Sequence, residues 1–137
     1  MVSVRESVTM AQGASLTTTN NGNIRLSAEG DITLSALNAG TGSVSIVSTT
    51  GSIVDGYDAT VDTSDAVNVV ASELRLSATT TGKSVGAADA ALDINVGTVS
   101  ANAAAGGLFL SEANAITVGQ TAAVTVNRVL DDGTLST

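Results

Sequence analysis

The sequence contains no cysteine, histidine, tryptophan or proline, and it has one tyrosine and one phenylalanine among its 137 residues. Without histidine the chain has no imidazole that could act as a general base. Without grouped aromatic side chains it has no platform on which sugars or nucleobases could stack. The composition therefore weighs against most classes of enzyme and against recognition of bases.

Positive charge is also scarce, because five lysine and arginine residues stand against 13 acidic residues and the formal net charge is −8. Such a chain repels nucleic-acid phosphates and anionic membrane surfaces, so we expect neither as a partner. The aliphatic residues are scattered singly among serine, threonine and glycine. We therefore expect neither a signal peptide nor insertion into a membrane.

The aliphatic residues alternate with polar ones in short segments, and this period of two predicts strands with one buried face. The strands are expected near residues 24–28, 32–36, 67–71, 74–78, 92–96, 108–110, 116–118 and 124–126. A glycine, a small polar residue and an aliphatic residue open several of them, at 22–24, 30–32, 42–44 and 51–53. We interpret each glycine as a corner with permissive backbone angles ahead of a strand.

The strands can be arranged as two alternating phrases. Phrase A opens at Val8, Ile24, Val44, Val67, Leu92, Leu108 and Val124, and phrase B opens at Leu16, Ile32, Ile53, Leu74, Val99 and Ile116. The interval from A to B is 7 to 9 residues, whereas the interval from B to the next A ranges from 8 to 18 residues. One nearly constant arc and one variable arc are typical of a solenoid, in which equivalent strands stack on one another.

These intervals predict an all-β fold, a parallel β-helix (β-solenoid) of about seven coils with its insertions on one side. Right-handed winding follows from the crossover preference of parallel strands. Residues 1–137 are expected to form a single solenoid segment. The alternation breaks after Val126, so residues 127–137 are candidates for leaving the helix.

Residues 22–56, "GNIRLSAEGDITLSALNAGTGSVSIVSTTGSIVDG", and residues 91–119, "ALDINVGTVSANAAAGGLFLSEANAITVG", resemble the β-strand repeats of large bacterial exoproteins and adhesins of the filamentous-haemagglutinin type. The resemblance implies a right-handed β-helical shaft at the bacterial cell surface or secreted outside the cell. It also implies a role in adhesion or in a biofilm matrix, with host-cell or matrix molecules as possible partners. The secretion domain of that family has no counterpart here, so an internal fragment of a longer repeat protein is expected.

The densest group of carboxylates, Asp55, Asp58, Asp62 and Asp65, lies in the acidic arc at residues 55–65. Several oxygen ligands in one loop are what Ca²⁺ prefers, and Ca²⁺ is the one cofactor hypothesis that the sequence offers. Solvated loop acids are the alternative, because the spacing matches neither an EF-hand nor the nonapeptide of calcium-binding β-rolls. We assign no catalytic, cofactor-binding or metal-ligating residue.

An enzyme on a β-helix would need carboxylates that converge on neighbouring coils. Asp31, Asp89, Asp93 and the pair Asp131–Asp132 are single or terminal acids. In the two-phrase register, the positions equivalent to Asp93 one coil before and after are Asn68 and Phe109. We therefore expect no enzymatic activity, and a fragment of a carbohydrate-active enzyme is kept as an alternative.

Arg25 and Arg75 fall in different phrases, so the two-phrase register keeps them apart. A partner would be sought on the variable side, at residues 37–43, 55–66 and 79–91. Neither terminus offers a capping helix, and open strand edges invite further stacking. A self-assembling extracellular fibre subunit, whose partners are identical chains, is therefore a second alternative.

Overall fold

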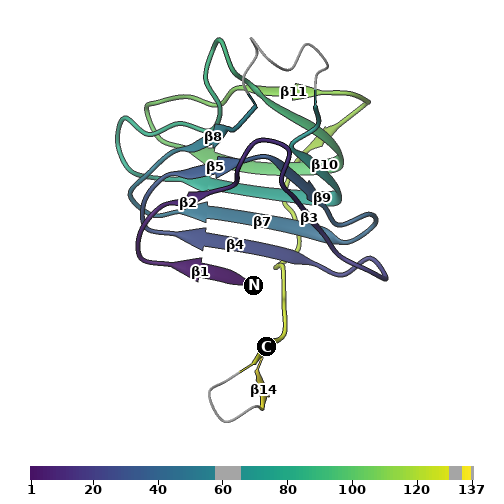
Figure 1. Cartoon of the computed structure of the whole chain (residues 1–137). Helices are drawn as coiled ribbons and strands as arrows, with labels where there is room; N and C mark the ends of the chain where they lie inside the picture. The colour runs from purple at the N-terminus through teal and green to yellow at the C-terminus, as the bar shows by residue number, and fades with distance from the viewer. Residues whose placement is uncertain (58–65, 130–133, 137) are drawn as a thin grey trace.

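The computed structural model describes residues 1–57, 66–129 and 134–136, and within them it contains strands and no helix (Figure 1). The strands are β1 (Val2–Val4), β2 (Val8–Thr9), β3 (Ser15–Thr17), β4 (Ile24–Ala28), β5 (Ile32–Leu34), β6 (Ala36–Asn38), β7 (Ser43–Ser48), β8 (Ile53–Asp55), β9 (Val69–Ala78), β10 (Leu92–Ala103), β11 (Leu110–Glu112), β12 (Thr117–Val118), β13 (Arg128–Val129) and β14 (Leu135–Ser136). Every described pair of these strands is parallel except β13 with β14. The predicted all-β class with parallel strands is confirmed.

The strands form three ladders that the chain visits in turn. The first ladder stacks β1, β4, β7, the second half of β9, the second half of β10 and β12. The second ladder stacks β2, β5 and β8, and single bridges at Val85 and Leu108 continue it. The third ladder stacks β3, β6, the first half of β9, the first half of β10 and β11.

Successive passes through the first ladder differ in length. Ile24 pairs with Val44 and Val44 with Leu74, so the chain returns after 20 and then 30 residues. The longer return contains residues 56–68, which connect β8 to β9, and residues 79–91 lengthen the next pass between β9 and β10. Both long connections adjoin the second ladder, whereas β9 and β10 run from the third ladder to the first without a break.

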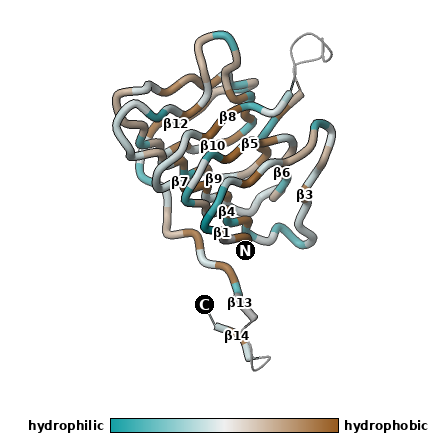
Figure 2. The backbone as a smooth tube through the Cα atoms, turned by 60° about the vertical axis from the view of Figure 1, so that its left-hand side comes forward, coloured by the Kyte–Doolittle hydropathy of each residue, from teal (hydrophilic) through white to brown (hydrophobic). Residues whose placement is uncertain are grey.

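Inward-facing aliphatic side chains stack in columns through the ladders, and Figure 2 shows the hydrophobic positions recurring along the stacked strands. Leu26, Ile46 and Leu76 form one such column, and each is at most 2% exposed. They belong to a single continuous cluster of buried residues. Burying one side chain of this size contributes about 1.5–3 kcal/mol, so the columns supply the main stabilisation of the fold.

The two-phrase register is wrong in several places. Val8 was expected beside Ile24 but pairs with Ile32. Val44 and Leu74 were expected in different phrases, yet the two residues pair with each other. Val124 opens no strand, and the first ladder holds six strand segments in the described residues, so seven coils are not observed. The cause is the third ladder: consecutive strands of the chain have similar spacing whichever ladder they join, so spacing alone did not separate the three ladders.

The recurring glycines have a different role from the one expected. Gly30 and Gly51, which precede β5 and β8, have no positive φ angle, so the corners do not need permissive backbone angles there. Instead, the backbone of Gly51 lies directly against that of Gly30 and Asp31 in the coil before it. A Cβ atom on Gly51 would collide with those backbone atoms. Close approach between successive segments of the second ladder is therefore what requires glycine at positions 30 and 51.

The segment from residue 119 to residue 127 contains no strand and crosses the first ladder (Figures 1 and 2). We call it the strap. The Ala122 amide donates to Glu73 Oε2 on β9, and Asn23 Nδ2, just before β4, donates to the Thr125 carbonyl oxygen. The strap thus runs from β12 back toward the β1 end, where β13 and β14 pair as an antiparallel hairpin.

Candidate functional site

The acidic arc is described at its first residue only, because Asp58, Asp62 and Asp65 lie outside the described residues. The Asp55 carboxylate already has partners within the chain: Oδ1 accepts the Tyr57 amide at 3.0 Å and Asn68 Nδ2 at 2.7 Å. Among the described residues no three acidic side chains lie together as metal ligands. The calcium hypothesis therefore stays a prediction.

Asn68 is fully buried, although the alternation placed it on the outside of its strand. Its Nδ2 donates to the Ser35 carbonyl oxygen and to Asp55, and its Oδ1 accepts the Asp93 amide at 2.8 Å. Its own backbone also bonds to Leu37 and Asp93. The side chain therefore acts as a clamp at the start of β9 that joins this strand to Ser35, to β8 and to β10.

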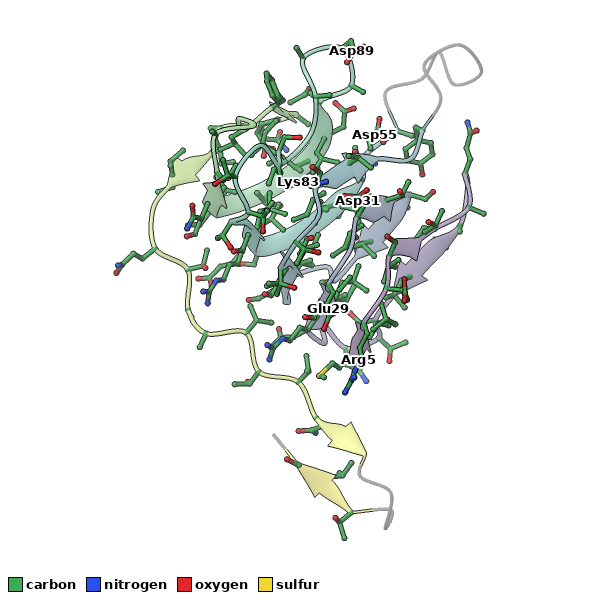
Figure 3. The ribbon with its side chains drawn as sticks, turned by 90° about the vertical axis from the view of Figure 1, so that its left-hand side faces the viewer. Arg5, Glu29, Asp31, Asp55, Lys83 and Asp89 are labelled. Carbon is green, nitrogen blue, oxygen red and sulfur yellow. The ribbon has the colours of Figure 1, made fainter. Side chains whose placement is uncertain are left out.

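The other acids do not gather into a catalytic arrangement in the described part of the chain. Asp31 forms an ion pair with Lys83 at 3.8 Å, and both side chains are substantially exposed (Figure 3). Asp93 lies beside Asn68 as expected, but its neighbour in the following coil is Ser111 and not Phe109. Asp89 lies apart in the connection before β10, and Asp131–Asp132 fall outside the described residues.

The structure brings together two arginines that the two-phrase register kept apart. Arg25 pairs in register with Ser45, Ser45 with Arg75, and Arg75 with Ser100, so the four residues form one outward column on the first ladder. At one strand spacing per step, the two arginine Cα atoms are about 10 Å apart. Both arginines are exposed, and in the described part of the chain neither forms an ion pair.

A better signal for this column was present in the sequence. The segment Ile24–Ala28 reads IRLSA and the segment 74–78 reads LRLSA, which differ only at the first residue. The two segments occupy the same ladder, with β7 between them. Similarity of the strand segments was therefore a more reliable guide to register here than the spacing between them.

The strap lies over this column and leaves two cavities beneath it. The larger has a volume of about 500 Å³ and is lined by Arg75, Leu76, Ser77, Ser100, Asn102, Gln120, Thr121 and Ala123. The second, of about 340 Å³, is lined by Arg25, Ser45, Val47, Arg75, Ala123 and Val124. Arg75 and Ala123 line both cavities, and we call the two adjacent cavities together the arginine groove.

The arginine groove is polar and positively charged, although the whole chain is acidic. Two of the five cations of the sequence lie in it, together with serine hydroxyls and the Asn102 and Gln120 side-chain amides. A planar guanidinium presents paired N–H donors that match a carboxylate. The groove can therefore hold an anionic ligand that also carries hydroxyl groups.

The variable segments proposed for a partner lie elsewhere. Residues 37–43 hold part of β6 and a short turn, so they are no insertion. Residues 79–91 form a long connection between β9 and β10 that contributes Val85 to the second ladder, while much of 55–66 lies outside the described residues. No ligand role for these segments is tested by the structure.

Comparison with protein-family models, with curated proteins and with solved structures found no match. Among the described residues no helix is long and apolar enough to cross a membrane.

Proposed function

We propose that the three ladders close into a right-handed parallel β-helix. On this proposal the chain is a rigid structural module, a shaft or spacer, of a bacterial surface or secreted adhesin. Its action there is adhesion or support of a biofilm matrix, outside the cell or at the cell surface. The observation that carries the proposal is the uninterrupted stacking of aliphatic columns, such as Leu26, Ile46 and Leu76, through successive parallel coils.

Two further observations support this function. The outward positions of the ladders carry mainly small polar side chains, which suit a solvated shaft. The repeats of residues 22–56 and 91–119 resemble those of filamentous-haemagglutinin-type exoproteins, whose shafts serve display and reach. In the described residues the acids do not converge, so no feature of these residues favours an enzyme over a shaft.

Rigidity can be measured in the double variant Ser15→Cys, Ser111→Cys with a spin label attached to each new cysteine. The chain has no cysteine of its own that would compete for the label. Both residues are exposed and lie in the third ladder, four strand steps apart. Four steps correspond to about 19 Å between Cα atoms. A narrow distance distribution centred near this value, widened by the label arms, is expected. A broad distribution would contradict the rigid shaft.

The proposed location has its own test. Antibodies raised against the chain should label intact cells of the producing bacterium, or its culture medium, without permeabilisation. A protease added outside should remove the label from the cells. Labelling that appears only after permeabilisation would refute the surface or secreted role.

A second candidate function, a self-assembling fibre subunit, is favoured by where apolar side chains are exposed. Val2, Val4 and Leu16 are exposed at one end of the stack, and Leu108 and Val118 at the other. End-to-end stacking of copies would bury both sets. Light scattering that rises steeply with protein concentration would support the fibre, and a monomer at every concentration would exclude it.

A further inference from the structure

We propose that the arginine groove binds an acidic oligosaccharide, with Arg25 and Arg75 each holding a carboxylate of the bound sugar chain. This inference rests on the geometry of the first ladder and goes beyond the shaft function. The ligand would be a short linear segment whose carboxylates recur on alternate sugar units.

The spacing of the arginines suits a ligand whose anionic groups repeat along its length. Arg25 and Arg75 are separated by one intervening strand, whose residue in the column is the buried Ser45. The Cα separation of about 10 Å allows the two side chains to extend side by side, so that each guanidinium can bind its own carboxylate. In that arrangement the two anionic groups of the ligand lie about as far apart as the arginines, as they do in a chain with regularly spaced carboxylates.

The rest of the lining favours a sugar over a peptide. Peptides commonly bind a sheet by adding a strand at a free edge, but β4, β7 and β9 are paired on both sides in the first ladder. The groove instead offers side chains: Ser77, Ser100, Asn102, Gln120 and Thr121. These hydroxyl and amide groups can exchange hydrogen bonds with the many hydroxyls of a sugar chain.

The lining also favours an acidic sugar over a neutral one. No aromatic side chain lines either cavity, so the apolar face of a neutral sugar ring finds no ring to pack on. Charge-assisted hydrogen bonds from the arginines are then the strongest contacts that the groove provides. Recognition through them requires a negative charge on the ligand.

The acidity of the whole chain does not prevent such binding at physiological salt. Charges farther away than about 8 Å are largely screened there. The labelled acids Glu29, Asp31, Asp55 and Asp89 belong to the second ladder and its connections (Figure 3). Glu73 lies two residues before Arg75 on β9, and its carboxylate accepts the Ala122 amide of the strap.

The test is calorimetric titration of the whole chain with a hyaluronan oligosaccharide, which carries an unsulfated carboxylate on every second sugar unit. Binding is expected, and Arg25→Gln or Arg75→Gln should each weaken it by about tenfold or more. Arg5→Gln is the matched control, because Arg5 is also an exposed arginine but lines neither cavity. It should change the affinity by less than about twofold, as expected for a distant surface charge.

The other ligands separate the alternatives. A neutral cello-oligosaccharide and an oligoglutamate peptide should bind at least tenfold more weakly than the hyaluronan probe. Equal binding of either would overturn the proposal, as would no binding of hyaluronan or an equal loss in Arg5→Gln. Tighter binding of a sulfated oligosaccharide that stays dependent on both arginines would keep the site and change only its preferred anion.

A circular dichroism melt of each variant distinguishes loss of binding from loss of fold. Arg25 and Arg75 are exposed, so melts matching that of the parent chain are expected. The outcome is also separable from the shaft proposal, because the distance between Ser15 and Ser111 depends on the third ladder and not on this groove.

Discussion

Replacement of Asn68 tests the coil-to-coil clamp, because this side chain is fully buried and bonds to three segments distant in sequence. Asn68→Ala removes the donor to the Asp55 carboxylate and the donor to the Ser35 carbonyl oxygen. It also removes the acceptor for the Asp93 amide. A net loss of about 1 kcal/mol for each neutral bond and about 2 kcal/mol for the charged one gives about 4 kcal/mol.

That loss is a large share of the free energy of unfolding of a typical domain, which is roughly 5–15 kcal/mol. Urea unfolding followed by far-ultraviolet circular dichroism is the suitable assay, since the chain has no tryptophan to report by fluorescence. The thermal midpoint should fall by at least about 10 °C for a chain of this size. Asn95→Ala is the control, because the Asn95 side chain makes an exposed bond to Asn114, and its loss should cost at most about 0.5 kcal/mol.

A second variant, Asn68→Asp, separates hydrogen bonding from packing. It keeps the size of the side chain but replaces the donor that lies 2.7 Å from Asp55 Oδ1 with a carboxylate oxygen. Two carboxylates at this distance repel when both are ionised and can share a proton when acidified. Relative to the parent chain, the loss of stability should be larger at pH 7 than at pH 4. A cost below about 1 kcal/mol for Asn68→Ala, or no pH difference for Asn68→Asp, would refute the clamp.

Three further predictions concern the stacking and the acidic arc. Gly51→Ala should destabilise the chain by about 1–3 kcal/mol, because the new Cβ would collide with the backbone of Gly30 and Asp31. Gly119→Ala is the control: its Cβ would meet no atom closer than 4.0 Å, so the midpoint of a thermal melt should not change. Val44→Ala should cost about 2 kcal/mol of stability in urea unfolding, since Val44 is fully buried. Val118 ends the same column and is 80% exposed, so Val118→Ala should cost less than about 0.5 kcal/mol. Melts with millimolar Ca²⁺ and with a chelator should share one midpoint, because Asp55 is already bonded within the chain; a higher midpoint in Ca²⁺ would instead assign a metal to the acidic arc.

The strand positions and the inward residues were largely predictable, because burial follows alternation directly. Ile24 and Leu26, for example, were expected inside and are nearly inaccessible to solvent. Asn68 was not predictable in this way. Alternation marks polar residues as outward, and a buried asparagine is stable only because backbone and carboxylate groups from other coils satisfy it.

The candidate site was less predictable, because it depends on which strands are neighbours. Arg25 and Arg75 are 50 residues apart in the sequence, and their column exists only because β4, β7 and β9 are consecutive in the first ladder. The strap adds Gln120, Thr121, Ala123 and Val124 to the groove, and Val124 had been expected in a strand. Spacing along the chain contains neither piece of information.

The sequence by itself determined the class of structure: short parallel strands, a narrow aliphatic interior and no helix among the described residues. These follow from a period of two and from small residues, which act locally through side-chain direction and burial. Only the tertiary structure decided the number of ladders, the register between coils, the burial of Asn68 and the arginine groove beneath the strap. Each of these depends on contacts between residues that are distant in sequence, where several registers satisfy the same local pattern and packing between coils selects one.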